Sequence, residues 1–414
     1  MAVSSDEDYP VTLAHDRMPT WLMLLIAAAC GLIVANIYYA QPLVGPIRAA
    51  IGLPAEAAGL IVTLTQLGYG AGLLLAVPLG DLVENRRLVL GLMGVLGLAL
   101  LGAMFARQAA AFLACSLAIG FGAVAVQVLV PYASHMAAEE ERGRVVGNIV
   151  SGLMLGIMLA RPVASFLAHL VSWQAVYGLS VLLMALLALV LRLLLPARVP
   201  PATLGYATLL GSMGGIVARF PVLRRRALYQ AGMFGAFSVF WTVTPLLLSG
   251  PAFGLDQSGI ALFALAGVAG AVAAPIAGRV ADRGWTRPAT AFCIAVVIAA
   301  FGATLATAHD AAASMHARLA LLTLAAVVLD FGVSGNLVLG QRAIYALGAE
   351  VRSRVNGIYM ATFFLGGAAG SALGAWAYAR AGWGGACAVG MALPALALLL
   401  FLSERRATVA APVV

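Results

Sequence analysis

Two charged side chains inside long apolar stretches are the residues with the clearest chemistry. Arg161 lies in the fifth apolar stretch of the chain and Asp330 in the tenth. Arg161 precedes Trp173 by 12 residues and Asp330 follows Arg318 by 12. At about 1.5 Å per helical residue, both lie about 18 Å from the same end of their stretches. A charge at that depth in a bilayer costs about 2.5–3.5 kcal/mol, so we expect each to face a partner or water and to be functional.

Two interpretations of this pair are open. In the first, Asp330 carries a coupling proton or binds a cationic group, while Arg161 tunes that carboxyl or binds an anionic group. In the second, the two charges form a static buried ion pair that keeps two parts of the protein in register. In either interpretation the two charges occupy matching depths in opposite halves of the chain.

Other polar and aromatic residues of the apolar stretches are spaced to line the same cavity. Gln230, Phe234, Phe237 and Trp241 recur along one face of a helix. Such side chains suit an aromatic or heterocyclic solute. The predicted substrate-binding residues are Asn36, Tyr39, Gln66, Tyr69, Gln127, Arg161, Gln230, Phe234, Phe237, Trp241, Asp330 and Ser334.

The composition defines the elements that must position these residues. The 414 residues are 63% hydrophobic and 10% charged, which excludes a soluble enzyme and a disordered chain. A bilayer crossing takes about 20 apolar residues. We therefore predict an all-α membrane protein with twelve transmembrane helices in two six-helix bundles. The spans are expected near 21–41, 57–80, 88–106, 109–134, 145–168, 174–195, 227–249, 258–281, 288–308, 317–345, 355–379 and 384–402.

The longest connection divides the chain into two related halves. We predict a cytoplasmic tail at 1–20, bundles at 21–195 and 227–403, a linker at 196–226 with a short helix on the membrane surface, and a second tail at 404–414. A shift of 210 residues places Glu140, Arg144 and Trp173 on Glu350, Arg354 and Trp383. Two halves repeated in the same orientation are typical of transporters that rock about a central site.

The basic residues indicate the orientation. All 24 are Arg, and most fall in the connections on the side of the amino terminus. Four, Arg48, Arg107, Arg318 and Arg380, fall on the opposite side. The positive-inside rule then places both termini of a multi-pass membrane protein in the cytoplasm.

Small residues recur every four positions in the second, fifth, eighth and eleventh spans. Such faces let two helix backbones approach closely. We expect the faces of the fifth and eighth spans, which carry Gly156 and Gly270, to oppose each other across the two halves.

Two loops carry related charged motifs. The loop after the eighth span reads Gly278-Arg-Val-Ala-Asp282-Arg283-Gly-Trp-Thr-Arg287, and the loop after the second keeps Asp81 and a basic pair. An Asp near the N-terminus of a neighbouring helix can latch two elements in one conformation. The alternative is that these charges only set the orientation. The predicted latch residues are Asp81, Arg86, Arg87, Gly278, Asp282, Arg283 and Arg287.

These loops resemble the Gly-x-x-x-Asp-Arg-x-Gly-Arg-Arg signature of the major facilitator superfamily. The first copy departs from it at Val77, Leu82 and Glu84. The run from Asn36 to Pro42 and the run from Asp330 to Gln341 look like a bacterial branch that includes purine ribonucleoside and drug exporters coupled to protons. The resemblance implies alternating access, small organic substrates, and a cavity between the first, fourth, seventh and tenth spans. The bacterial branch also implies that the protein lies in the bacterial inner membrane.

The leading functional hypothesis is a proton-coupled antiporter that exports a small organic molecule. Uptake by proton symport and facilitated diffusion through the same site are the alternatives. We expect no enzyme activity, because no metal-ligand cluster, phosphate-binding loop or nucleophile set is apparent. The only energy source expected is the proton gradient, without a cofactor. The expected partners are the substrate, protons and the lipid bilayer, with no nucleic acid, and the protein is expected to be a monomer.

Overall fold

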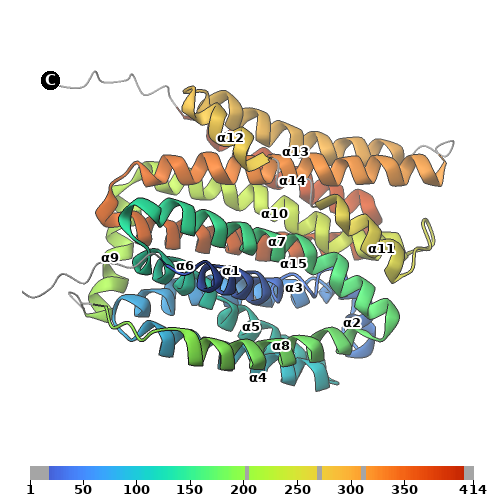
Figure 1. Ribbon diagram of the computed structural model, residues 1–414. Coiled ribbons are helices and arrows are strands. Elements are labelled where there is room, and N and C mark those ends of the chain that lie inside the picture. The colour runs from blue at the N-terminus through green and yellow to red at the C-terminus, as the bar shows by residue number, and fades with distance from the viewer. Residues whose placement is uncertain (1–17, 201–204, 268–272, 309–313, 405–414) are drawn as a thin grey trace, which may run out of the picture.

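The computed structural model describes residues 18–200, 205–267, 273–308 and 314–404. Within these ranges the secondary structure is entirely helical, which confirms the predicted fold class. Nine helical segments of the described part are long and apolar enough to cross a membrane, and two shorter apolar helices accompany them. The long helices run side by side, with α4 and α8 at one edge and α12 and α13 at the other (Figure 1).

The N-terminal half contains eight α-helices. They are α1 (Thr20–Ala35), α2 (Val44–Ala50), α3 (Leu60–Leu75), α4 (Asn85–Phe105), α5 (Ala109–Ala123), α6 (Ala125–Met136), α7 (Arg142–Leu170) and α8 (Trp173–Leu194). Together α5 and α6 form the fourth span, interrupted at Val124. Short 3₁₀ turns at Val77–Asp81 and Glu139–Glu141 precede α4 and α7.

The C-terminal half follows a connecting helix, α9 (Tyr206–Arg219). Its helices are α10 (Pro221–Ser249), α11 (Gln257–Ala264), α12 (Ala273–Asp282), α13 (Thr286–Ala308), α14 (Met315–Tyr345) and α15 (Arg352–Leu402). The eighth span is α11 followed by α12. The eleventh and twelfth spans are both in α15, which turns at Ala381 and Gly382, where φ of the glycine is +58°.

The first span is shorter as a helix than the sequence predicts. The prediction ran to residue 41, but α1 ends at Ala35 and the chain continues in turns to Leu43. The Asn36 side chain donates hydrogen bonds to the carbonyls of Leu32 and Ile33. A short amide side chain that binds its own backbone competes with helix continuation. The turns that follow carry Tyr38 and Gln41, two residues of the site described below.

The linker helix α9 packs against protein. Its apolar residues Leu209, Met213 and Ile216 are buried, and the last two join a cluster with Val355 and Tyr359 of α15. The linker face that the sequence suggested for the membrane surface is therefore occupied by α15.

Gly156 packs within its own half, so the expectation that this residue faces the eighth span is wrong, although α7 does contact α11 of the eighth span elsewhere. A Cβ on Gly156 would overlap the backbone of Gly31 on α1, and a Cβ on Gly152 would come within 2.6 Å of the Ala27 carbonyl. The repeat-related Gly366 meets Ala231 of α10 in the same way. Periodicity indicates a close contact without saying which helix makes it. Gly270 lies outside the described residues.

Candidate functional site

Arg161 is buried, with 3% of the residue's surface exposed. Its Nε donates to the side-chain oxygen of Gln41 at 2.7 Å. Its guanidinium carbon lies 4.4 Å from the ring centre of Trp241, 4.9 Å from that of Phe237 and 5.2 Å from that of Tyr38. Aromatic rings from both halves therefore surround the cation, an arrangement that stabilises Arg where water is excluded.

Asp330 lies across from Arg161 on α14 and is equally buried. Its Oδ1 accepts a hydrogen bond from the indole nitrogen of Trp241 at 2.9 Å. The two charged groups, both in the described part, are too far apart for a direct ion pair. Trp241 lies between them, since its ring contacts the guanidinium and its N–H binds the carboxylate. Among the described residues, Arg161 and Asp330 are the two buried ones with a formal charge.

Two buried donors of this site lack a hydrogen-bond partner among the described residues. They are Nη2 of Arg161 and the amide nitrogen of Gln41. Leaving a buried donor unpaired costs about 1–3 kcal/mol, and more for a charged group. A solute that accepts hydrogen bonds, or water, would satisfy both donors.

Gly267 closes one side of the site. A Cβ placed on it would lie 3.1 Å from Oδ2 of Asp330, 3.1 Å from the Trp241 ring and 3.3 Å from Nη1 of Arg161. Both charged groups and the indole therefore converge on one small space, which exists because residue 267 has no side chain.

Replacing Gly267 with Ala is expected to fill this space. The added methyl group would meet three side chains at distances shorter than ordinary contacts, and overpacking of this kind costs about 1–3 kcal/mol. We expect substrate affinity to fall about tenfold. Titration of transport rate against substrate concentration in liposomes measures this. Gly97→Ala is the matched control, because nothing lies within 4 Å of its Cβ position. Equal affinities for the two variants would contradict the assignment.

An aromatic layer lies next to the charged centre. Phe234 stacks on Phe363 with ring centres 3.6 Å apart and on Phe237 at 5.1 Å. Tyr69 packs against Phe364 at 4.4 Å, and its hydroxyl accepts a hydrogen bond from Gln127. The predicted residues Phe234, Phe237, Tyr69 and Gln127 are thus placed in one region.

The remaining predicted binding residues are divided. Gln66 joins the halves, since its amide donates to Ser238 of α10 at 2.9 Å. Asn36 instead accepts from Ser180 of α8, and Gln230 accepts from Asn336 of α14 at 2.6 Å. The Asn36 amide therefore joins the end of α1 to α8 within the N-terminal half. The Gln230 amide joins α10 to α14 within the C-terminal half. Tyr39 is buried and Ser334 is half-buried, and neither makes a polar contact with another described residue.

Gln41 and Tyr38 are site residues that the predicted set omits. The prediction assumed a continuous helix through residue 41, in which Asn36 and Tyr39 share a face. The turns after Ala35 rotate Tyr38 and Gln41 toward Arg161 instead. The sequence feature that could have identified these two residues is the pair of polar side chains, Asn36 and Gln41, that flank Tyr38 and Tyr39.

The halves contact each other on one side of the charged centre. Thr63 of α3 donates to the Ala368 carbonyl of α15 at 3.0 Å, and its hydroxyl lies 2.8 Å from that of Ser371. Ser165 of α7 donates to the side-chain oxygen of Gln257 of α11 at 2.8 Å. These contacts join α3 to α15 and α7 to α11 across the two halves.

A further contact between the halves lies near the end of α7. His169 lies 3.5 Å from Asp256, which caps the N-terminus of α11. Hydrogen bonds from the Ser258 hydroxyl and the Gly259 amide lower the pKa of Asp256, so its carboxylate is ionised at neutral pH.

Joining Ser165 to Gln257 is expected to block transport. Cys replacements at both positions, linked by a short thiol cross-linker, would hold the two halves in the arrangement seen here. A transporter that must alternate between two conformations would then stop transporting, and reductive cleavage of the cross-link would restore transport. Each single Cys variant treated with the same reagent is the control. Full transport by the cross-linked double variant would show that this contact does not separate during the cycle.

The predicted latch residues contact neighbours in their own half. In the first motif, Arg87 pairs with Glu84 at 3.2 Å and Arg86 donates to the Leu195 carbonyl, while Asp81 is exposed. Glu84, where the family signature has Gly, also accepts the amide of Arg86 and so caps α4. Glu84 therefore caps α4 and pairs with Arg87, while the latch role of Asp81 stays a prediction.

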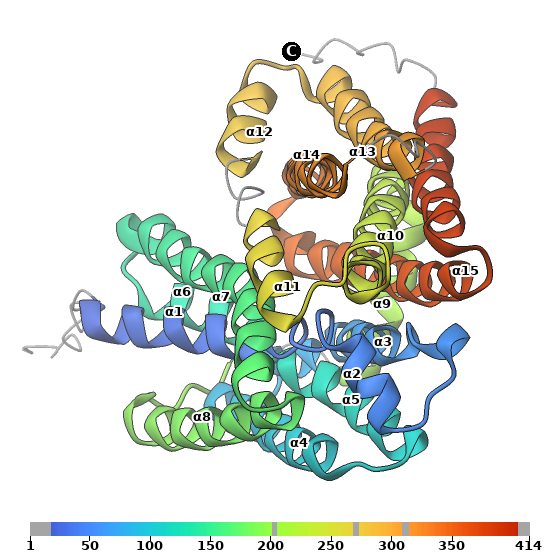
Figure 2. The same ribbon diagram turned by 90° about the vertical axis from the view of Figure 1, so that its right-hand side faces the viewer.

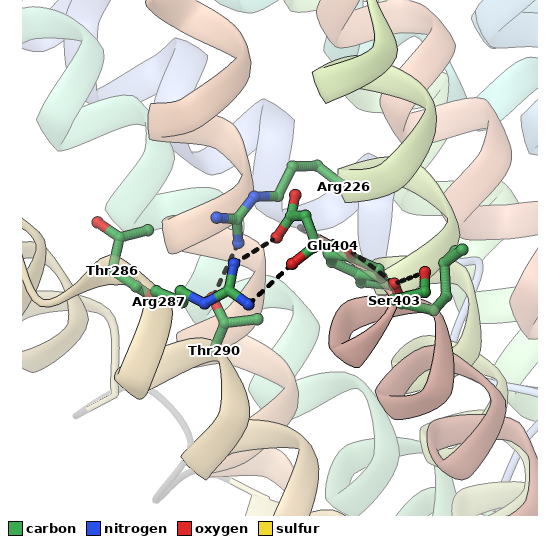
Figure 3. A network of polar contacts seen from close by, with 8 residues as sticks. Arg226, Thr286, Arg287, Thr290, Ser403 and Glu404 are labelled. Atoms are coloured by element: carbon green, nitrogen blue, oxygen red, sulfur yellow. Dashed lines mark hydrogen bonds and ion pairs between the residues drawn. The ribbon is translucent and has the colours of Figure 1, made fainter. Parts of the chain in front are cut away.

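The second motif is divided between two contacts. Asp282 pairs with Arg342 of α14 at 2.6 Å, and the same Arg donates to the Gly278 carbonyl. Arg287 instead pairs with Glu404 after the last helix, as Figure 3 shows. Arg283 is exposed.

The network around Arg287 binds three helices of the C-terminal half. Arg226 of α10 donates to Thr290 of α13, next to the Arg287–Glu404 pair (Figure 3). Arg287 also lies 4.9 Å from the ring centre of Phe401 on α15. These contacts fix α10, α13 and the end of α15 as one unit.

Comparison with known proteins agrees with this architecture. Residues 23–323 match the Major Facilitator Superfamily, and the chain belongs to that family. It is 38% identical to the "Uncharacterized transporter YgaY" of Escherichia coli O157:H7 over 94% of this chain and 96% of that one. It is 34% identical to the "Probable transporter SCO4007" of Streptomyces coelicolor over 88% of this chain and 83% of that one.

Solved structures share the fold at low sequence identity. A point mutant of the nucleoside transporter NupG superposes with a TM-score of 0.72 at 14% identity, covering 92% of this chain and 98% of that one. A D-xylose-proton symporter superposes with a TM-score of 0.69, also at 14% identity, covering 93% and 97%. Membership of the Major Facilitator Superfamily makes the protein a multi-pass secondary transporter for a small molecule, and it confirms the predicted superfamily.

Proposed function

We propose that the protein is a proton-coupled antiporter that exports a small organic molecule by alternating access, with Asp330 carrying the coupling proton. The observation that carries the proposal is the buried Arg161–Trp241–Asp330 group, which joins α7 of one half to α10 and α14 of the other. Both charges lie where the halves meet. A change in the charge of Asp330 therefore alters the electrostatic attraction between the two halves.

The arrangement allows the proton and the solute to compete for Asp330, as antiport requires. When Asp330 is ionised, it balances the charge of Arg161, and its Oδ2 faces the space beside Gly267. When Asp330 is protonated, that balance is lost and the carboxyl becomes a donor. A solute that binds Asp330 in its ionised form therefore competes with the proton for the same group.

The aromatic rings support the choice of solute. Phe237, Trp241 and Tyr38 present ring surfaces around the unpaired donors of Arg161 and Gln41. Flat solutes that carry hydrogen-bond acceptors fit both features. We further propose that both termini are cytoplasmic, that the protein acts as a monomer in the bacterial inner membrane, and that 21–195 and 227–403 are the two moving bundles.

Proton movement in liposomes tests this function. The purified protein is reconstituted in vesicles that contain a pH-sensitive dye, and gradients of aromatic and heterocyclic solutes are imposed in turn. Antiport predicts that at least one solute drives protons in the direction opposite to its own. Protons that move with the solute would indicate symport, and solute flux without proton movement would indicate facilitated diffusion. Either result would overturn the proposal.

A further inference from the structure

A cavity of about 280 Å³ lies between α12, α13 and α14, away from the charged centre. Figure 2 shows these three helices grouped at one edge of the molecule. The cavity opens toward the surrounding bilayer, because Trp285 and Phe292 on its wall are 63% and 58% exposed. Its lining is almost wholly apolar and includes Ala277, Val280, Trp285, Phe292, Phe331 and Leu339.

Two basic residues, Arg279 and Arg283, flank Val280 of the cavity wall in the sequence. Arg283 follows Val280 by three residues and therefore lies on the same face of the α12 turn. Its amide donates to the Arg279 carbonyl, so the helical path continues to that residue. Gly284, with φ of +77°, then reverses the chain and lets the Trp285 amide bind the Val280 carbonyl at 3.2 Å. The reversal places the indole against the cavity beside Arg283.

The charge at this end is not balanced. Asp282 is the nearest carboxylate in sequence, and it is engaged by Arg342. Arg279 and Arg283 are exposed, and neither has an ion-pair partner among the described residues. Two exposed Arg residues beside Val280, at the end of α12 that lines an apolar cavity, are complementary to an amphiphile with an anionic head.

We propose that this cavity binds an acyl chain of an anionic phospholipid whose phosphate is held by Arg279 and Arg283. The apolar walls exclude the head group, and the basic end selects its charge. The ligand therefore bridges α12 and α13 at the end of the eighth span. This site does not depend on the coupling role of Asp330, so it can be tested on the purified protein without transport.

Trp285 provides a reporter for the test. The protein in detergent is titrated with phosphatidylglycerol or with phosphatidylcholine, both with the same dibrominated acyl chains, which quench indole fluorescence on contact. The difference between the wild type and Trp285→Phe isolates the signal of this residue. We expect phosphatidylglycerol to bind more tightly than phosphatidylcholine, by about fivefold for each Arg.

Two variants test the contributions of the lipid head group and of the acyl chain to binding separately. The double variant Arg279→Gln/Arg283→Gln should bind both lipids with the affinity of phosphatidylcholine. Ala289→Leu, which adds bulk to the cavity wall, should weaken both lipids. Arg107→Gln/Arg380→Gln removes two exposed Arg at the opposite end of the helices and should keep the preference for phosphatidylglycerol.

Equal affinity of the wild type for the two lipids would overturn the proposal and leave only ordinary bilayer contact. A preference that survives in Arg279→Gln/Arg283→Gln would overturn it as well. If the double variant does not fold, the comparison of the two lipids on the wild type still decides the question.

Discussion

Asp330→Asn is expected to abolish proton-driven transport while the protein stays folded. The amide keeps the shape of the carboxyl and can still accept the hydrogen bond from Trp241. It cannot take up or release a proton in the range that drives transport. Solute-for-solute exchange, which needs no net proton movement, is expected to persist. Both reactions are measured in the same liposomes, with an imposed pH gradient for the first and equal pH for the second.

The matched control for this variant is Glu139→Gln. It also neutralises a carboxylate, but at an exposed turn before α7. We expect it to transport normally. If Asp330→Asn keeps the full dependence on the pH gradient, the buried pair is structural and the coupling group lies elsewhere.

Gly156→Ala is expected to reduce the stability of the protein strongly, through packing alone. The added methyl group would overlap the Gly31 backbone of α1, which cannot move aside as a side chain tip can. Overpacking against side chains costs about 1–3 kcal/mol, and a backbone contact should lie at or above the upper end of that range. Thermal unfolding in detergent and the yield of monodisperse protein measure the effect.

The control is Gly147→Ala, earlier on the same helix, where nothing lies within 4 Å of the Cβ position. The change from Gly to Ala raises the helix propensity equally at both positions. Gly147→Ala should therefore leave the unfolding temperature unchanged or raise it slightly. Equal unfolding temperatures for the two variants would contradict the close contact between α1 and α7.

Hydropathy and charge were sufficient to predict the helical architecture and the central pair. Apolar stretches of about 20 residues have few alternatives to membrane helices, because each backbone polar group must be satisfied within the segment. Arg161 and Asp330 stand out because a charge in such a stretch is costly. Their matching depth followed from residue spacing alone, without knowledge of the packing.

Other parts of the site depend on tertiary structure that spacing does not encode. The end of α1 at Ala35 is decided by one amide side chain, and it determines whether Tyr39 or Gln41 faces the site. Glycine spacing revealed a close helix contact, but the partner of Gly156 is set by how the half packs. Ser165 and Gln257 are ordinary polar residues near helix ends and give no signal in the sequence.

The central claim is that Asp330 takes up the coupling proton. Infrared difference spectroscopy tests it most directly, because a buried protonated carboxyl gives a carbonyl band separate from those of exposed acids. We predict a band that rises and falls as the pH of the purified wild-type protein is cycled, and that is absent from Asp330→Asn. An identical pH-dependent band in the wild type and in Asp330→Asn would contradict the claim.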